Sequence, residues 1–506
     1  MTKRAGRKPT GAGHDVRVLR SAESLATPLH VQVYRQLRDN IMAGALKPGA
    51  RLPSARTLAS DLRVSRNTVD AAFAQLRAEG LIVRRVGAGT VVASAISHVA
   101  PFIGRRVPRA LEAVSVKPSR PPLRGDVLSD RGRLIATLGA AEIEEDRYAS
   151  EAVTHVRGFP ASTWTRLLSE RVRTGGVAML QSSDPFGTSE LREAIADQAR
   201  LTRGVNCTAA QVIVVNSTQQ AIDLAARLLL DDGSVAALED PGYASARAAL
   251  LAAGATVLPV PVDDGGMMVD ALEREHHVRL AYVSPSHQFP LGVTMSLARR
   301  QALLAWARES DAWIIEDDYD SEFRYADRPM LSLQGMDRDG RVLYIGTFNK
   351  VMFPGLRLAY LIVPEALVAA FGAARRISDG FSSPLLQSAL ADFLTRGHFA
   401  AYVRAARNHY EANRDVLLAS IAREWGGAVT LGPSETGLHV VAHLDESCDD
   451  RAIARGAAMQ GLWIAALSRY CHGGSVRRGL LLSYGAATPE QVAADVATLT
   501  PWVTRR

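Results

Sequence analysis

The most specific chemistry in this chain is offered by a lysine near the end of a β-rich segment. Lys350 follows Gly346-Thr347-Phe348-Asn349 and precedes Pro354-Gly355-Leu356-Arg357. A lysine amine that desolvation or nearby positive charge keeps neutral can form a Schiff base with an aldehyde. The neighbouring hydroxyl and guanidinium groups suit a phosphate, so the motif indicates covalent capture of a phosphorylated aldehyde. A lone lysine is more often a solvated surface residue, so the choice between the two interpretations depends on the other motifs in this part of the chain.

A cluster of acidic residues supports the same chemistry. Residues 312–315 are expected to form a buried strand that delivers Glu316, Asp317, Asp318 and Tyr319 at its C-terminal edge, where ligands bind in open α/β sheets. A carboxylate there can keep a pyridine nitrogen protonated, and a tyrosine hydroxyl can bond the phenolic oxygen of the ring. The alternative is that these are ordinary solvated loop acids.

A second strand leads into hydroxyl residues at a predicted helix start. Residues 212–215 are all Val or Ile, and Ser217 and Thr218 follow them directly before a helical segment. The backbone N–H groups of such a helix start bind anions. We therefore expect the phosphate here, assisted by Thr347 and Arg357, although Ser217 and Thr218 could merely cap the helix.

The N-terminal part of the chain has a different pattern, of short helices. Tyr34, Leu37 and Ile41 recur at helical spacing, and Ser54 and Ser65 are expected to cap the second and third helices. Three short helices that precede a hairpin indicate either a winged helix-turn-helix or an ordinary small helical bundle.

The third helix and the hairpin carry the features that favour DNA binding. Arg66, Asn67 and Thr68 are expected at the exposed N-terminal end of the helix, where a recognition helix meets base edges. Strand-like alternation on both sides of Gly87-Ala88-Gly89 predicts a hairpin with a glycine-rich tip, which would form the wing.

Positive charge gathers in the same region. The chain has a net charge of +7, and Arg51, Arg56, Arg66 and Arg85 stand where a duplex would lie in a winged-helix unit. Charge alone is weak evidence for nucleic acid, but together with the helix order it predicts binding to double-stranded DNA.

These N-terminal motifs resemble the GntR family of winged-helix repressors. The resemblance is carried by Leu52 to Arg56, Val64 to Val69 and Gly87 to Thr90, and it spans the segment from Pro28 to Val92. It implies DNA contacts by a small set of polar residues and a wing glycine, namely Arg56, Ser65, Arg66, Thr68 and Gly89.

The second part of the chain resembles the fold-type I aminotransferases over roughly residues 155–500. Besides the lysine and acidic motifs, the signs are Asp184 to Gly187, Glu239 to Tyr243 and Ser284 to Pro290. The combination with a GntR-like reader resembles the MocR subgroup of regulators. The resemblance implies pyridoxal 5'-phosphate as cofactor, with Lys350 as the Schiff-base lysine, Asp317 at the pyridinium, Tyr319 beside the phenolic oxygen, Tyr243 against the ring, and Ser217, Thr218, Thr347 and Arg357 around the phosphate.

Three positions depart from the aminotransferase pattern. Phe289 replaces an asparagine that bonds the phenolic oxygen, Ser182 replaces a tyrosine that reaches the phosphate of a neighbouring subunit, and Leu481 replaces the arginine that holds the substrate carboxylate. Loss of a bidentate arginine removes both orientation and charge compensation for a carboxylate. Arg247, Arg477 or Arg478 could compensate only by reaching the pocket.

The composition fits a soluble α/β protein of more than one domain. With 506 residues, 47% hydrophobic and 22% charged, and no apolar run long enough to span a bilayer, a cytoplasmic location without membrane contact is expected. Three scattered cysteines indicate no metal site. We expect a basic flexible tail over 1–27, the winged helix over 28–93, a linker over 94–150, and the aminotransferase-like effector and dimerisation domain over 151–506.

The leading hypothesis is a homodimeric transcription regulator whose operator binding changes with the state of the cofactor site, without net catalysis. Leu481 favours pyridoxal phosphate itself, or an amine lacking a carboxylate, as the effector. The alternatives are an active aminotransferase with an accessory DNA-binding domain, and a DNA-binding protein whose enzyme-like domain serves only for dimerisation.

Overall fold

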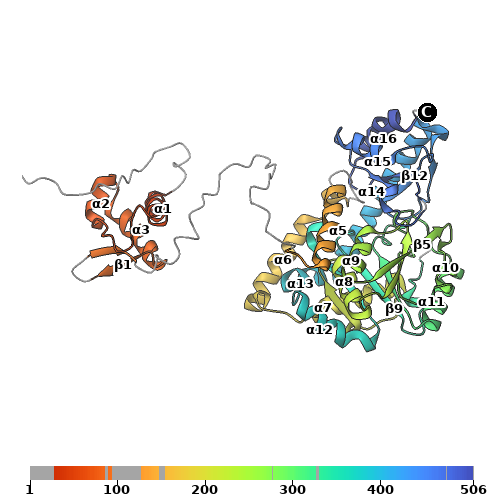
Figure 1. The fold of residues 1–506 in the computed structure, drawn as a ribbon, viewed down its shortest axis with the longest axis horizontal. Coiled ribbons are helices and arrows are strands. Elements are labelled where there is room, and N and C mark those ends of the chain that lie inside the picture. Colours follow the sequence, from red (N-terminus) through yellow and green to blue (C-terminus); the bar gives the residue numbers. More distant parts are fainter. Residues whose placement is uncertain are drawn as a thin grey trace, which may run out of the picture. The chain divides into compact units, whose positions relative to one another are not determined.

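The computed structural model describes residues 28–85, 89–93, 127–146, 154–275, 277–325, 330–474 and 476–504. The chain divides into two compact units between Pro122 and Leu123 (Figure 1). The expected tail over 1–27 and residues 94–126 of the expected linker lie outside the described residues. No helix in the described ranges is long and apolar enough to cross a membrane.

The N-terminal unit is a winged helix-turn-helix. It contains α1 (Leu29–Met42), α2 (Ala55–Leu62), α3 (Arg66–Ala78), and the antiparallel hairpin of β1 (Ile82–Arg85) and β2 (Gly89–Val92). The hydroxyls of Ser54 and Ser65 accept hydrogen bonds from backbone N–H groups in the first turns of α2 and α3, as expected of capping residues. Val33, Val69 and Leu76 are fully buried between the helices.

The C-terminal unit is built on an eight-stranded sheet of order β3-β10-β9-β8-β7-β4-β5-β6. The strands are β3 (Val212–Val215), β4 (Val235–Asp240), β5 (Thr256–Asp263), β6 (Gly266–Met267), β7 (Val278–Val283), β8 (Trp313–Asp318), β9 (Val342–Thr347) and β10 (Ala359–Ile362). Strands β5, β4, β7, β8 and β9 run parallel in this order, whereas β10 is antiparallel to both of its neighbours. The carboxyl ends of β7, β8 and β9 therefore meet at one edge of the sheet.

Helices cover this sheet and connect it to a smaller one. The helices are α6 (Ala161–Gly175), α7 (Ser189–Arg203), α8 (Thr218–Leu229), α9 (Ala244–Ala252), α10 (Asp270–Glu273), α11 (Leu297–Glu309), α12 (Val368–Ser378), α13 (Pro384–Thr395), α14 (His398–Glu424), α15 (Asp450–Ala458) and α16 (Pro489–Val503). The smaller antiparallel sheet has the order β11-β12-β14-β13 and comprises β11 (Thr430–Leu431), β12 (His439–His443), β13 (Ala465–Ala466) and β14 (Gly479–Ser483). Helices α14, α15 and α16 lie beside it (Figure 1).

One boundary predicted from the sequence is wrong. The predicted linker over 94–150 contains the helix α5 (Asp130–Asp146), which packs against α9 and forms an ion pair from Arg131 to Asp232. Its apolar residues do not gather on one face, and Leu134 and Ile135 are exposed, so helical periodicity gave no signal. The C-terminal unit therefore begins before residue 151.

Candidate functional site

The start of the recognition helix exposes the polar side chains that the sequence indicated. Arg56, Arg66 and Asn67 are exposed in the structure. Ser65 and Thr68 form hydrogen bonds within the helix start. Their hydroxyl oxygens lie 2.8 Å apart, and Ser65 Oγ accepts a hydrogen bond from the Thr68 N–H. Arg66 Nε lies 3.3 Å from Asp70 Oδ2 in an exposed ion pair. Exposed guanidinium and amide groups at a helix start can contact phosphates and base edges.

The base of the wing brings a further arginine next to Gly89. Gly89 has a φ of +79°, and a Cβ added to it would lie 3.4 Å from Nε of Arg51. Arg51 also forms a β-bridge with Val91, so its exposed side chain is anchored to the wing. Arg51 therefore joins the candidate nucleic-acid interface.

The C-terminal unit contains a pocket of about 530 Å³ at the carboxyl edge of the large sheet. Every residue that the sequence assigned to the cofactor lines it: Ser217, Thr218, Tyr243, Asp317, Tyr319, Thr347, Lys350 and Arg357. These residues belong to segments that follow β3, β4, β8 and β9 or end those strands. The topology thus brings together side chains that are more than a hundred residues apart in the chain.

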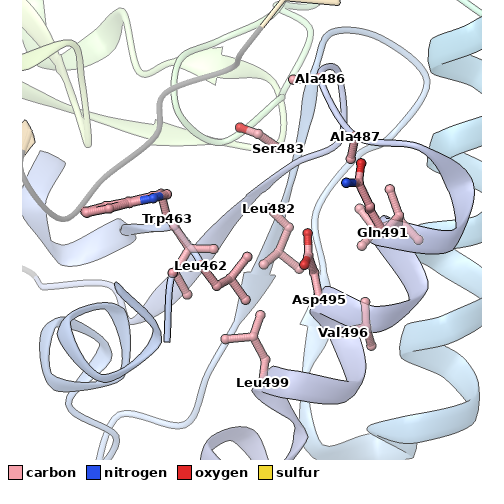
Figure 2. A pocket seen from close by; sticks show the side chains of 14 residues that line it. Leu462, Trp463, Leu482, Ser483, Ala486, Ala487, Gln491, Asp495, Val496 and Leu499 are labelled. Atoms are coloured by element: carbon pink, nitrogen blue, oxygen red, sulfur yellow. The ribbon is translucent and has the colours of Figure 1, made fainter. Parts of the chain in front are cut away.

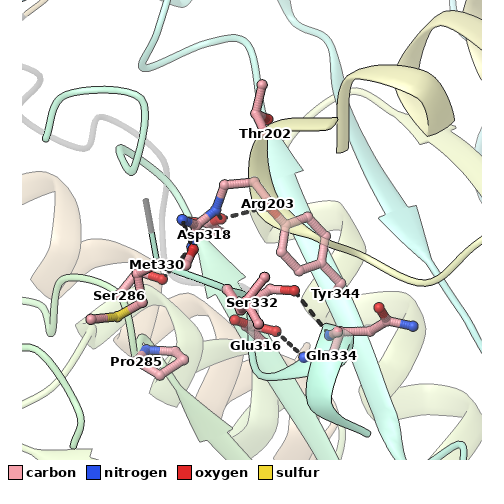
Figure 3. Close-up of polar contacts among 12 residues, drawn as sticks. Thr202, Arg203, Pro285, Ser286, Glu316, Asp318, Met330, Ser332, Gln334 and Tyr344 are labelled. Carbon is pink, nitrogen blue, oxygen red and sulfur yellow. Dashed lines mark hydrogen bonds and ion pairs between the residues drawn. The ribbon is translucent and has the colours of Figure 1, made fainter. Parts of the chain in front are cut away.

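Strand alternation decides which carboxylate of β8 faces this pocket. Asp317 lines the pocket, whereas Glu316 and Asp318 point to the other side of the strand (Figure 3). Asp318 accepts a hydrogen bond from Nε of Arg203 at 2.6 Å, and Glu316 accepts the backbone N–H of Leu333 at 2.8 Å. Both outer carboxylates are therefore engaged in the fold, which leaves Asp317 for the pocket.

The environment of Asp317 suits a positively charged ring nitrogen. Its Oδ2 accepts the hydroxyl of Tyr282 at 2.5 Å, whereas its buried Oδ1 has no hydrogen-bond partner among the described residues. Burial raises the pKa of Asp317 to about 7, and the neighbouring Asp318 and Asp320 add to the increase. A buried acceptor without a partner costs free energy, and a pyridinium N–H placed at Oδ1 would remove that cost.

The opposite part of the pocket suits a phosphate. Ser217 caps α8, and its hydroxyl accepts the Gln220 N–H at 3.1 Å, so the N–H groups of Thr218 and Gln219 lie in the first turn, where no intrahelical acceptor exists. Arg357 supplies the positive charge. The side chain of Lys350 makes no hydrogen bond within the described part of the chain, which leaves its amine available in the pocket.

Aromatic side chains close the pocket. The ring of Phe289 lies 5.8 Å from that of Tyr243 and 6.0 Å from that of Tyr319, both in edge-to-face geometry. Phe289 occupies the place where a hydrogen-bonding side chain was expected, so this wall offers apolar contact only.

Leu481 does not line the pocket itself but belongs to the buried apolar cluster that includes the lining residue Phe289. It is 3% exposed on β14 and packs in one cluster with Phe289 and Tyr470. Arg478 is bonded to Asp450 at 3.2 Å, and Arg477, which donates to the carbonyl of Val262, does not line the pocket. Arg247 does not line the pocket either. No replacement for the missing arginine is thus found among the residues that line the pocket.

A second cleft, of about 300 Å³, lies between β14 and α16 (Figure 2). Its wall is largely apolar, with Leu462, Leu482 and Leu499. Among its lining residues the only carboxylate is that of Asp495, and burial raises the pKa of this group. Its lining residues include no lysine or arginine, so it offers neither an amine for covalent capture nor a phosphate site.

Sequence reasoning missed Tyr282 and Ser284 as pocket residues. The signal for Tyr282 was a hydroxyl in the buried second half of β7, Val278–Val283, because a buried hydroxyl needs a partner. The partner is Asp317, from the neighbouring strand. Within the described residues no group of side chains is arranged to hold a metal ion.

Comparison with known proteins relates each unit to a family. Residues 29–92 match the gntR family of bacterial regulatory proteins, and residues 166–479 match the aminotransferases of class I and II. The chain is 37% identical over 473 residues to the probable rhizopine catabolism regulatory protein MocR of Rhizobium meliloti, covering 93% of each chain. It is 29% identical to the HTH-type pyridoxine biosynthesis transcriptional regulator PdxR of Corynebacterium glutamicum, covering 91% of this chain and 92% of that one.

Among solved structures, the C-terminal unit is similar to an α-aminoadipate aminotransferase of Thermus thermophilus. The identity is 26%, the TM-score is 0.67, and the match covers 74% of this chain and 96% of that chain. That enzyme was solved with N-(5'-phosphopyridoxyl)-L-leucine. The predicted fold class is confirmed, and the regulators among the relatives favour the regulator hypothesis over the aminotransferase hypothesis.

Proposed function

Because the chain belongs to the MocR-type regulators of the GntR family, in which a winged helix precedes an aminotransferase-like domain, we propose that it is a transcription regulator whose operator binding responds to pyridoxal 5'-phosphate at Lys350. The observation that carries this proposal is the convergence of all the expected cofactor residues on one pocket. Control by a ligand requires that the ligand has different affinities for two arrangements of the protein.

Each wall of the pocket has a proposed role in holding the cofactor. When bound, pyridoxal phosphate supplies an electrophilic aldehyde for the amine of Lys350. The unpartnered Oδ1 of Asp317 accepts a hydrogen bond from the protonated ring nitrogen. Ser217, Thr218, Thr347 and Arg357 surround the phosphate, Tyr243 packs on the ring, and Tyr319 donates to the phenolic oxygen.

The apolar wall limits which effectors suit the site. Phe289 lines the pocket with an apolar ring, and Leu481, which shares its buried cluster, supplies no charge to a ligand attached at Lys350. A buried carboxylate without a partner is costly. The effector is therefore pyridoxal phosphate itself or an amine that lacks a carboxylate. The lack of an arginine partner for a substrate carboxylate also argues against turnover of ordinary amino acids.

The proposed partners are double-stranded DNA and a second copy of the chain. The exposed polar residues Arg56, Arg66 and Asn67 support operator contact. In the short 3-10 helix Gly176–Leu180, which directly follows α6, Val177 is 69% exposed and Leu180 is 83% exposed. Neighbouring exposed apolar side chains mark interaction surfaces, which supports a homodimer with two readers for repeated half-sites.

The visible absorption spectrum of the full-length protein with added pyridoxal phosphate tests the cofactor proposal. We expect a yellow form that borohydride reduces, and no such form in Lys350→Ala. Operator binding by the parent should then change with added cofactor, whereas Lys350→Ala should bind the operator equally well in both conditions. A full-length protein that stays colourless would favour the hypothesis that the enzyme-like domain serves only for dimerisation.

A further inference from the structure

We propose that His287, held by Asp320, is a positioning residue that orients the hydroxyl of Tyr319 so that its proton points into the cofactor pocket. The inference rests on the proposed cofactor site and deepens it, because it assigns a function to a buried pair of side chains behind the pocket wall. Neither His287 nor Asp320 lines the pocket itself.

The three side chains form a continuous buried contact. His287, in the segment after β7, is 2% exposed, and Asp320, two residues beyond the end of β8, is 1% exposed. His287 Nδ1 lies 2.9 Å from Asp320 Oδ2 and 2.9 Å from the hydroxyl oxygen of Tyr319. One ring nitrogen thus faces both the carboxylate and the tyrosine hydroxyl.

This geometry fixes where the protons lie. A carboxylate is an acceptor only, so Nδ1 must carry its hydrogen to avoid placing two lone pairs against each other. A protonated Nδ1 can no longer accept from Tyr319, and the hydroxyl oxygen of Tyr319 therefore accepts from Nδ1–H in a shared hydrogen bond. The Tyr319 O–H hydrogen has to point elsewhere, and the pocket that Tyr319 lines is the available direction.

The surroundings of His287 keep the ring in this orientation. Gly437 has a φ of +84°, and a Cβ added there would lie 2.0 Å from Cε1 of His287. His439 packs on the other side with 5.1 Å between ring centroids, and its Nε2 lies 2.9 Å from the carbonyl of Pro290. The imidazole is thus enclosed by backbone and by a second fixed ring.

The arrangement compensates for a missing hydrogen bond. Phe289 stands where aminotransferases have a side chain that bonds the phenolic oxygen, so Tyr319 is left as the donor to that atom. Burial and the nearby Asp320 and Asp317 raise the pKa of Tyr319 well above its usual value, which keeps the hydroxyl protonated. A protonated hydroxyl with a fixed direction can donate without reorganisation.

The test follows the pH dependence of the visible absorption of full-length protein loaded with pyridoxal phosphate. A donor to the phenolic oxygen favours its deprotonated form, so loss of the donor raises the midpoint of the colour change. A hydrogen bond worth about 1 kcal/mol converts to a rise of about 0.7 of a pH unit. The groups that face His287 are Asp320, Tyr319 and His439, with Asp317 and Lys350 farther along the pocket wall.

His287→Leu should raise the midpoint by about 0.7 of a pH unit, and His287→Asn should restore it, because its amide N–H takes the place of Nδ1–H. In a Tyr319→Phe background, His287→Leu should have no further effect, since the two residues act through one hydroxyl. His443→Gln, which alters a histidine at the other end of β12, is the matched control and should leave the midpoint unchanged. If His287→Leu does not fold, His287→Gln replaces it. The longer side chain of glutamine carries the amide beyond the Nδ1 position, so this variant should also raise the midpoint.

An unchanged midpoint in His287→Leu or His287→Gln overturns the inference, as does an additive effect in the Tyr319→Phe background. A parent protein that does not bind pyridoxal phosphate would refute the cofactor proposal instead, so the two failures are distinguishable.

Discussion

Asp317→Asn is expected to affect the free and the cofactor-loaded protein in opposite directions. Folding raises the pKa of this carboxyl from 3.8 to about 7 through burial, and at about 1.36 kcal/mol for each pKa unit its ionisation inside the fold costs about 4 kcal/mol. Because the folded state binds this proton more tightly than the unfolded chain, the contribution of Asp317 to the free energy of unfolding falls as the pH rises from about 4 to about 7. Asparagine removes this dependence.

Urea unfolding of the parent and of Asp317→Asn at about pH 5 and about pH 8 measures the effect. Without cofactor, the variant should be more stable by about 4 kcal/mol at the higher pH and by about 1–2 kcal/mol at the lower pH. With pyridoxal phosphate, loss of the carboxylate that faces the ring nitrogen should weaken cofactor binding about tenfold or more. Asp495→Asn, in the second cleft, is the matched control and should leave cofactor affinity unchanged. The reasoning is refuted if the stability difference is the same at both pH values or if cofactor affinity does not fall.

Three further predictions concern the reader unit and the apolar wall. Arg66→Ala should weaken operator binding by about 1–3 kcal/mol at matched salt, measured by fluorescence anisotropy, while the cofactor spectrum stays unchanged. Phe73→Ala removes a core side chain of the winged helix and should destabilise that unit by about 3–5 kcal/mol in calorimetry, leaving the melting of the C-terminal unit in place. Leu481→Arg should lower the stability of the free protein, because it buries an unpaired charge. With pyridoxal phosphate bound, the variant should let amino acids change the visible spectrum, because the guanidinium pairs with their carboxylate. A spectrum that stays insensitive to amino acids would contradict this account of specificity.

Short-range patterns account for what could be predicted. The caps Ser54 and Ser65 and the strands after which ligands bind are set by neighbouring residues along the chain. The helix α5 was missed because its apolar residues face no single side, so its helical state depends on packing against α9. Local periodicity carries no information about a helix of that kind.

The sequence by itself determined the two-part organisation, the helix-turn-helix with its wing, the αβ alternation and the identity of the lysine motif, because each depends on spacings of a few residues. The resemblance already implied Asp317 as the carboxylate that meets the cofactor, but only the tertiary structure decided how Glu316 and Asp318 are held, because their partners come from other segments. It also decided that Tyr282 supports Asp317 and that His287 and Asp320 support Tyr319. These contacts join residues from separate strands and loops, and side-chain partners across a sheet edge follow from strand order and register, which the linear spacing of residues does not contain.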